Sequence, residues 1–251
     1  MRNSSAFHRR SPIIHYSLKY YIIVIAIINA MQKEHEQLAA LLTDKEVISD
    51  GPFQFLRGKK GETEVVLMQS GIGKVNAAVG GVELIRRFRP SALINTGVAG
   101  GIDAGLRVAD VVAGAKVVYH DVDCGPESEP GCVQGMPLFY EADEALLAVA
   151  RGVQAESRIV EGLICSGDQF ITDKAQLAQI KGRFPEALAV DMESGALAQV
   201  CHIYGVPFLS FRIVSDTPGA EDHSEQYLNF WDEMAERSFG VTRALVEALT
   251  R

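Results

Sequence analysis

Three carboxylates of this chain follow apolar segments that are typical of β-strands, and carboxylates at such positions can move protons. Asp216 follows the apolar run 206–214, and Glu34 and Glu193 follow two other runs of the same kind. Carboxylates that share one cleft do general acid and general base work when their surroundings separate their pKa values. Each of the three residues, taken alone, also has a structural interpretation as a helix cap, a turn residue or a first-turn acid.

The elements that must position these carboxylates alternate along the chain. Apolar, β-branched runs alternate with segments of helical periodicity, which indicates a largely parallel sheet covered by helices. Ligands bind beyond the carboxyl ends of the strands in such sheets, so the residues after each run are site candidates. The strand candidates are 20–28, 53–58, 63–69, 91–95, 110–119, 158–165, 187–190 and 206–214, and the helix candidates are 32–43, 74–88, 143–153, 173–183, 193–204 and 224–249.

Glycine-rich segments connect several of these elements. The residues 58–61 predict a hairpin between two strands, which makes the sheet mixed. The residues 70–74 resemble a phosphate loop but lack the Walker spacing, and 96–101 predict a tight turn from a strand into a helix. The residues 121–137 contain three prolines and three glycines and predict a long loop, of the kind that often serves function or an interface.

Composition limits the possible functions. The chain has 251 residues, of which 47% are hydrophobic and 22% charged, which fits one α/β domain over 19–251 after an extension over 1–18. A net charge of −8 makes the chain a poor candidate for nonspecific nucleic-acid binding, which phosphate neutralisation drives. The four cysteines form no C-x-x-C pair, which favours a reduced, cytoplasmic protein. No ligand set completes a metal site around His120 and Cys124, so we predict neither metal nor cofactor.

The N-terminal region imitates a signal peptide, because basic residues precede the apolar run 20–28. That run is too short to cross a membrane and is rich in β-branched residues. We interpret it as a buried parallel strand, since cleavage there would remove the first strand of the sheet, and we expect no contact with a membrane.

Seven blocks that follow strand candidates occur in a distinctive order. They are Ala30-Met31 with Glu34, Ser70-Gly71-Ile72-Gly73-Lys74-Val75, Asn95-Thr96-Gly97-Val98-Ala99-Gly100-Gly101, Tyr119-His120-Asp121, Ser166-Gly167-Asp168-Gln169-Phe170-Ile171, Asp191-Met192-Glu193 and Arg212-Ile213-Val214-Ser215-Asp216. Together they resemble the 5′-methylthioadenosine/S-adenosylhomocysteine nucleosidases of the nucleoside phosphorylase superfamily, over about residues 20–250. The resemblance implies a three-layer α/β fold with a central mixed, largely parallel sheet flanked by helices.

The resemblance also implies a reaction and roles. It implies hydrolysis of the N-glycosidic bond of 5′-methylthioadenosine and S-adenosylhomocysteine, with 5′-deoxyadenosine as a further candidate. Asp216 matches the general acid toward N7 of the purine, which requires a pKa above the usual value of about 3.9. Glu34 matches the glutamate that activates water, and Arg212 the arginine that helps to position it. Other matches are Glu193 and Met192 for ribose, Phe170 and Ile171 for the purine, Ser215 beside Asp216, and Met31, Ile72, Cys124, Phe170 and Tyr227 for the 5′-thioalkyl pocket.

Four positions depart from the pattern of many family members. Val98 stands where serine is common near the attacking water and ribose, and Asp191 stands where glutamate is common. Asn29 replaces a frequent glycine, and Tyr227 replaces a frequent phenylalanine, so its hydroxyl favours a more polar 5′ group. For Met31, Ile72 and Tyr227, ordinary core packing is an equally good interpretation.

Charge distinguishes a hydrolase from a phosphorylase on this fold. Phosphorylases hold phosphate with arginines after the first strand and before the glycine-rich turn. Here the residues 29–34 and 94–97 contain no arginine, and Glu34 would repel a phosphate dianion while accepting a proton from water. The alternatives are a purine nucleoside phosphorylase, a futalosine-type nucleosidase and a catalytically idle nucleoside-binding protein. The resemblance further implies a homodimer in which the loop 121–137 of the partner completes the 5′ pocket.

Overall fold

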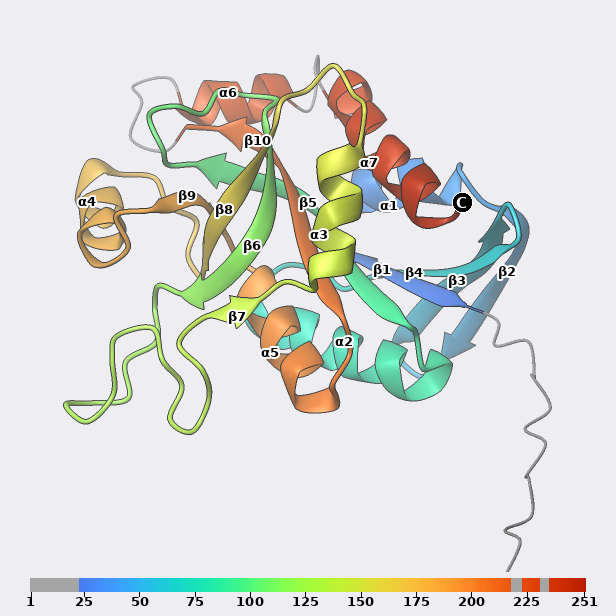
Figure 1. The fold of residues 1–251 in the computed structure, drawn as a ribbon, viewed down its shortest axis with the longest axis horizontal. Helices are drawn as coiled ribbons and strands as arrows, with labels where there is room; N and C mark the ends of the chain where they lie inside the picture. The colour runs from blue at the N-terminus through green and yellow to red at the C-terminus, as the bar shows by residue number, and fades with distance from the viewer. Residues whose placement is uncertain (1–22, 218–222, 231–234) are drawn as a thin grey trace, which may run out of the picture.

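One mixed sheet forms the centre of the protein (Figure 1). The computed structural model describes residues 23–217, 223–230 and 235–251, so the predicted extension over 1–18 and the first residues of the strand candidate 20–28 lie outside the described residues. The strands are β1 (Val24–Asn29), β2 (Thr43–Asp50), β3 (Phe53–Lys60), β4 (Thr63–Gln69), β5 (Ala92–Gly101), β6 (Val111–Tyr119), β7 (Tyr140–Glu141), β8 (Ile159–Ser166), β9 (Ala187–Asp191) and β10 (Phe208–Asp216).

The strand order brings the ends of distant segments together. It is β10-β6-β8-β9-β5-β1-β4-β3-β2, and β10 also pairs with β5. Parallel pairing joins β1 to β4 and β5, β10 to β5, and β8 to β6 and β9. Because β10 pairs with both β5 and β6, and β9 pairs with both β5 and β8, these five strands join in a closed ring. The carboxyl ends of β1 and β10 therefore lie near the glycine-rich half of β5.

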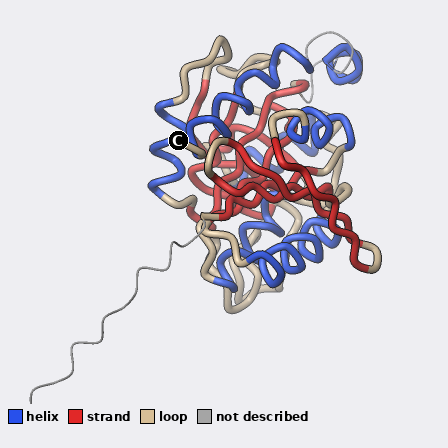
Figure 2. The backbone as a smooth tube through the Cα atoms, turned by 90° about the vertical axis from the view of Figure 1, so that its right-hand side faces the viewer, coloured by secondary structure: helices blue, strands red, loops and turns tan. Residues whose placement is uncertain are grey.

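Alternating side chains of the strands build a core on each face of the sheet. In β1, Ile25 and Ile27 belong to one core, and Ala26 and Ile28 belong to the other, as the two-residue period of a strand requires. The helices α1, α3 and α7 cover the first core, and α2 and α5 cover the second, so that helices lie on both sides of the strands (Figure 2). The helices are α1 (Gln32–Ala39), α2 (Lys74–Phe88), α3 (Glu144–Gly152), α4 (Lys174–Arg183), α5 (Ser194–Tyr204), α6 (His223–Asn229) and α7 (Ala235–Leu249).

The predicted three-layer architecture is confirmed. The helix predicted over 74–88 and the strand predicted over 63–69 have those bounds in α2 and β4. The predicted hairpin at 58–61 joins β3 to β4, which pair in antiparallel fashion up to Lys60 and Thr63. The loop predicted over 121–137 contains no helix or strand. In the part of the chain that the structure describes, no helix is long and apolar enough to cross a membrane.

Three predicted elements were wrong in their bounds or type. The helix predicted over 32–43 ends at Ala39, and the undetected strand β2 follows, because this edge strand is exposed on both faces and lacks the apolar alternation of a half-buried strand. The residues 96–101 continue β5 instead of turning, since they pair with β10 and β9. The helix predicted over 224–249 is divided into α6 and α7, and the residues 231–234 between them lie outside the described residues.

Candidate active site

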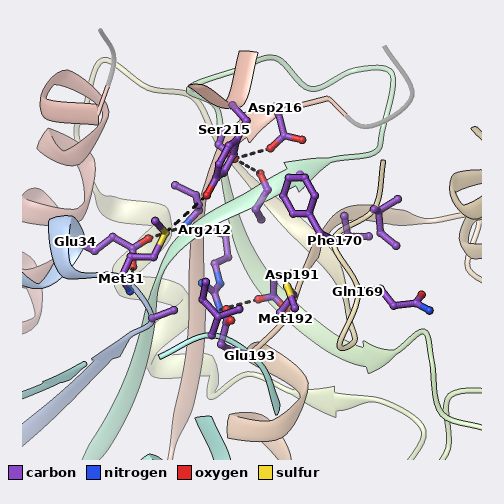
Figure 3. A pocket seen from close by; sticks show the side chains of 18 residues that line it. Met31, Glu34, Gln169, Phe170, Asp191, Met192, Glu193, Arg212, Ser215 and Asp216 are labelled. Carbon is purple, nitrogen blue, oxygen red and sulfur yellow. Dashed lines mark hydrogen bonds and ion pairs between the residues drawn. The ribbon is translucent and has the colours of Figure 1, made fainter. Parts of the chain in front are cut away.

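A cavity opens where β1, β9 and β10 end and where β5 passes beside them (Figure 3). Its empty space, including its open mouth, is about 630 Å³. The residues around it are Ala30, Met31, Glu34, Ile72, Val98, Ala99, Gly100, Gln169, Phe170, Ile171, Val190, Asp191, Met192, Glu193, Arg212, Ser215, Asp216 and Tyr227.

The structure brings together all but one of the residues that the sequence singled out. Cys124 is exposed in the loop 121–137 and does not line the cavity of its own chain. Its predicted place in the 5′ pocket therefore requires a second copy of the chain.

Arg212 is the buried cation of the site, with a side chain that is only 1% exposed. Its Nη2 atom lies 2.8 Å from Asp191 Oδ2 and 3.2 Å from Glu193 Oε2. Burial lowers the pKa of Arg212, but the charges of Asp191, Glu193 and Glu34 outweigh burial and hold this pKa above its usual value. A guanidinium that is this deeply buried needs such partners, because an unpaired charge in the interior is strongly destabilising.

Three polar residues that the sequence did not predict as site residues hold Arg212 in place. Asp191 forms the ion pair, Asn95 Oδ1 accepts a hydrogen bond from Nη2, and Ser194 Oγ accepts one from Nε over 3.3 Å. Ser194 Oγ in turn contacts Asp191 and Asn95. Asp191 carries the same signal as Asp216, an acid at the end of an apolar strand, and that signal could have identified it.

Glu34 accepts hydrogen bonds both from the start of α1 and from β5 beside the cavity. Its Oε2 atom accepts a hydrogen bond from the Met31 N–H (3.1 Å) at the start of α1, so its structural interpretation as a first-turn acid is also correct. Its Oε1 atom accepts a hydrogen bond from the Val98 N–H (3.2 Å) on β5. Burial raises the pKa of Glu34 from 4.5 to about 7, against the opposing charge of Arg212. A carboxyl with this pKa is suited to take a proton near neutral pH.

Gly97 leaves room for the side chains of both Glu34 and Arg212 beside its Cα atom. Its φ angle is +146°, and a Cβ atom there would lie 2.6 Å from Arg212 Nη1 and 2.9 Å from Glu34 Oε1. Any side chain at this position would therefore displace one of the two charged groups. The glycine-rich sequence of β5 thus serves close packing and not the turn that was predicted.

Glu193 and Asp168 occupy the N-terminus of α2. Glu193 Oε1 accepts a hydrogen bond from the Gly73 N–H (3.0 Å), and Asp168 Oδ1 accepts one from the Lys74 N–H (2.7 Å). Helix N-termini bind anions through such free N–H groups. In the loop 70–74, which resembles a phosphate loop, carboxylates of the protein itself take these two donors.

Asp216 lines the cavity at the end of β10 and is buried, with 2% of its surface exposed. Ser215 Oγ lies 2.7 Å from Asp216 Oδ1, which accepts its hydrogen bond (Figure 3). The Thr217 N–H donates a hydrogen bond to Gln226 Oε1 (2.9 Å), which fixes α6 against the end of β10. A buried carboxyl group at the cavity wall, with one oxygen oriented by a neighbouring hydroxyl, is positioned to exchange a proton with a ligand.

Aromatic and apolar side chains also line the cavity. The rings of Phe170 and Tyr227 lie 5.5 Å apart, with their planes inclined by 70°. The Tyr227 hydroxyl donates a weak hydrogen bond to the Met31 sulfur over 3.9 Å. Ile72, Val98 and Met31 complete an apolar lining beside this pair. The cavity therefore combines a flat aromatic surface, an apolar recess and a row of carboxylates.

A family model described as the phosphorylase superfamily matches residues 24–247. The 5′-methylthioadenosine/S-adenosylhomocysteine nucleosidase of Chromohalobacter salexigens is 44% identical over 229 residues, which cover 90% of this chain and 97% of that protein.

Two solved structures extend the comparison. The crystal structure of the nucleosidase of the same name from Neisseria meningitidis, in complex with methylthio-immucillin-A, has a TM-score of 0.85 and 36% identity and covers 90% of this chain and 99% of that one. The futalosine hydrolase of Helicobacter pylori has a TM-score of 0.83 and 30% identity and covers 90% of this chain and 98% of that one.

The raised pKa of Glu34 predicts how stability depends on pH. The unfolded chain releases this proton near pH 4.5 and the folded chain near pH 7, so the folded state binds more protons between these values. The free energy of unfolding therefore falls as pH rises through this window, by on the order of 3 kcal/mol. Glu34→Gln removes this loss, and we expect it to raise the melting temperature relative to the wild type more at about pH 8 than at about pH 5.

Thermal melts at the two pH values test this expectation. Glu36→Gln, on the exposed side of the same helix, is the matched control and should show the same difference from the wild type at both pH values. A Glu34→Gln effect that is also independent of pH would show that Glu34 is ionised throughout.

Proposed function

The chain belongs to the 5′-methylthioadenosine/S-adenosylhomocysteine nucleosidases of the phosphorylase superfamily, and we propose that it cleaves these nucleosides with water. Its reaction is hydrolysis of the N-glycosidic bond, which releases adenine and a 5-thioribose. The observation that carries the proposal is the charge of the cavity. Among the described residues around it, four carboxylates (Glu34, Asp191, Glu193, Asp216) face one cation, Arg212, which is already paired.

This charge favours a neutral nucleoside and water over phosphate. A phosphate dianion requires unpaired cations or free N–H donors. Arg212 is bonded to Asp191 and Glu193, and carboxylates occupy the Gly73 and Lys74 N–H groups at the start of α2. A purine nucleoside phosphorylase would need phosphate-binding groups, and those at Arg212 and at the start of α2 already have partners within the protein.

Each charged residue of the cavity has its own role in the proposed reaction. As the C1′–N9 bond breaks, its electron pair passes to the purine, and Asp216 donates a proton to N7. Positive charge develops on the ribose, which the carboxylate of Glu193 stabilises at short range. Glu34 takes a proton from water as the water oxygen bonds to C1′. Arg212 holds Glu193 and, through its charge, favours the ionised form of Glu34.

The aromatic and apolar lining of the cavity supports the substrate class. Phe170 offers a ring to the purine, and the buried backbone of Ile171 lies beside it to contact the edge of the base. Met31, Ile72 and Tyr227 form an apolar recess that suits a 5′-thioalkyl group. Futalosine is the alternative substrate, because the Tyr227 hydroxyl offers a hydrogen bond to a more polar 5′ group.

Adenine release in phosphate-free buffer tests this function. We expect the wild type to release adenine from both nucleosides and Asp216→Asn to lower kcat by about 10²–10⁴-fold, the usual contribution of a general acid. Asp110→Asn is the control, because Asp110 is a buried, ion-paired aspartate outside the cavity and its loss should leave kcat unchanged. A normal rate for Asp216→Asn in a folded protein would remove Asp216 from the mechanism.

We further propose that the chain acts as a cytoplasmic homodimer. Its four cysteines are free, which supports a reducing compartment. Beside the cavity mouth, Ile72 is 54% exposed, and Val75 and Val79 on α2 are 73% and 45% exposed. Exposed apolar side chains in such a cluster are typical of an interface, and a partner seated on them could bring its loop 121–137 to the 5′ pocket.

A charge on this cluster should separate the subunits. We expect Val75→Glu to shift the protein from dimer to monomer in sedimentation analysis and to raise KM, because each site loses the loop of its partner. Val47→Glu changes another exposed valine (59%) on the edge strand β2 and should leave both the dimer and KM unchanged. A wild type that sediments as a monomer would contradict the dimer.

A further inference from the structure

The segment that carries Phe170 and Ile171 has no regular secondary structure to hold it. The residues 167–172 connect the end of β8 to α4 and lie outside both elements. Ile171 is 3% exposed and packs in a hydrophobic core, but Phe170 is 51% exposed, so packing alone does not fix the Phe170 ring. The position of Phe170 therefore also depends on the contacts that hold the residues before it.

A cluster of three charged residues anchors this segment at Asp168. The Asp168 N–H donates a hydrogen bond to Asp121 Oδ2 (2.9 Å), and Asp168 Oδ1 accepts one from the Lys74 N–H (2.7 Å). Lys74 Nζ lies 2.7 Å from the same Asp121 Oδ2 atom. Both the backbone and the side chain of Asp168 are therefore held, two residues before Phe170.

Lys74 connects this anchor to the ribose side of the cavity. The preceding residue, Gly73, donates its N–H to Glu193 Oε1 (3.0 Å). Lys74 Nζ also lies 5.3 Å from the centre of the Tyr119 ring. A Cβ atom on Gly195 would lie 2.5 Å from that ring, so Tyr119 packs directly against the first turn of α5, beside Glu193. One lysine thus contacts the segments that position the purine wall and the ribose carboxylate.

Lys74 supplies the positive charge that balances the two aspartates of this cluster. Asp121 and Asp168 are both acidic and are joined through the Asp168 backbone N–H, and Asp121 Oδ1 is buried without a hydrogen-bond partner among the described residues. The side chains of Lys74 and Asp121 are 26% and 15% exposed, so solvent screens the pair only in part. None of the three residues lines the cavity. Without the ammonium group, the partly buried Asp121 carboxylate would lose its charge partner, and its hold on the Asp168 N–H, and so on the segment 167–172, would weaken.

We propose that Lys74, Asp121 and Asp168 are positioning residues that fix the purine-binding segment relative to Glu193. The inference rests on the proposed function for the identity of the ligand, an adenine nucleoside. It predicts that loss of the lysine charge weakens the binding of adenine itself, because adenine contacts the purine wall and carries no ribose for Glu193 to bind. Turnover of the bound substrate is affected less, because Glu34 and Asp216 do not touch the cluster.

Lys74→Gln tests the proposal. We expect the dissociation constant of adenine, measured by calorimetry, and KM for 5′-methylthioadenosine to rise together by about tenfold, while kcat changes by less than about threefold. Lys60→Gln is the matched control: Lys60 is 28% exposed and pairs with Glu247 over 3.2 Å, away from the cavity. It should leave all three quantities unchanged, and Lys74→Arg should restore most of the affinity for adenine.

A second pair of variants keeps the test valid if Lys74→Gln folds poorly. Asp121→Asn retains an oxygen that can accept from the Asp168 N–H, and Asp121→Ala does not, so adenine should bind more weakly to Asp121→Ala. Unchanged adenine affinity in folded Lys74→Gln, or equal affinity in the two Asp121 variants, would overturn the positioning role. A wild type that binds adenine but releases none from either nucleoside would overturn the proposed function instead and leave the adenine test intact.

Discussion

The site depends on one buried guanidinium. Arg212 projects from β10 and forms ion pairs with Asp191, the last residue of β9, and with Glu193 just after it. Its charge also acts on Glu34, which follows β1. These segments are far apart in the sequence, and only the pairing of β5 with β1, β9 and β10 brings them together. Because a buried arginine must be paired, the same interaction that completes the fold also orients the carboxylates of the cavity.

The excess of carboxylates over cations gives the cavity its chemistry. Burial raises the pKa of Glu34 to about 7, while Arg212 opposes this shift, so a small change of pH changes its protonation. Burial likewise raises the pKa of Glu193 against the effect of Arg212. Donors that could have bound a phosphate group are satisfied within the protein at Gly73 and Lys74. We infer that this arrangement stabilises positive charge on a sugar and leaves water as the nucleophile.

The sequence predicts the residues that face the ligand better than those that support them. Asp216, Glu34 and Glu193 follow apolar strands, a pattern that is visible without a structure. Asn95 and Ser194 have no such pattern, because their role depends on the direction in which Arg212 crosses the sheet. The strand β2 went undetected for a related reason: it is exposed at the edge of the sheet, so its sequence carries no apolar alternation. The glycines of β5 predicted a turn, whereas tertiary contacts keep them in a strand.

The identity of the nucleophile is the most direct test of the claim that this cavity catalyses hydrolysis. A single turnover of 5′-methylthioadenosine in ¹⁸O-labelled water with excess phosphate, quenched before the sugar exchanges its anomeric oxygen, identifies the group that bonds to C1′. Water activated beside Glu34 predicts a 5-thioribose that carries one labelled oxygen, and no sugar phosphate. A ribose 1-phosphate without label would contradict the assignment of the carboxylate-rich cavity to hydrolysis.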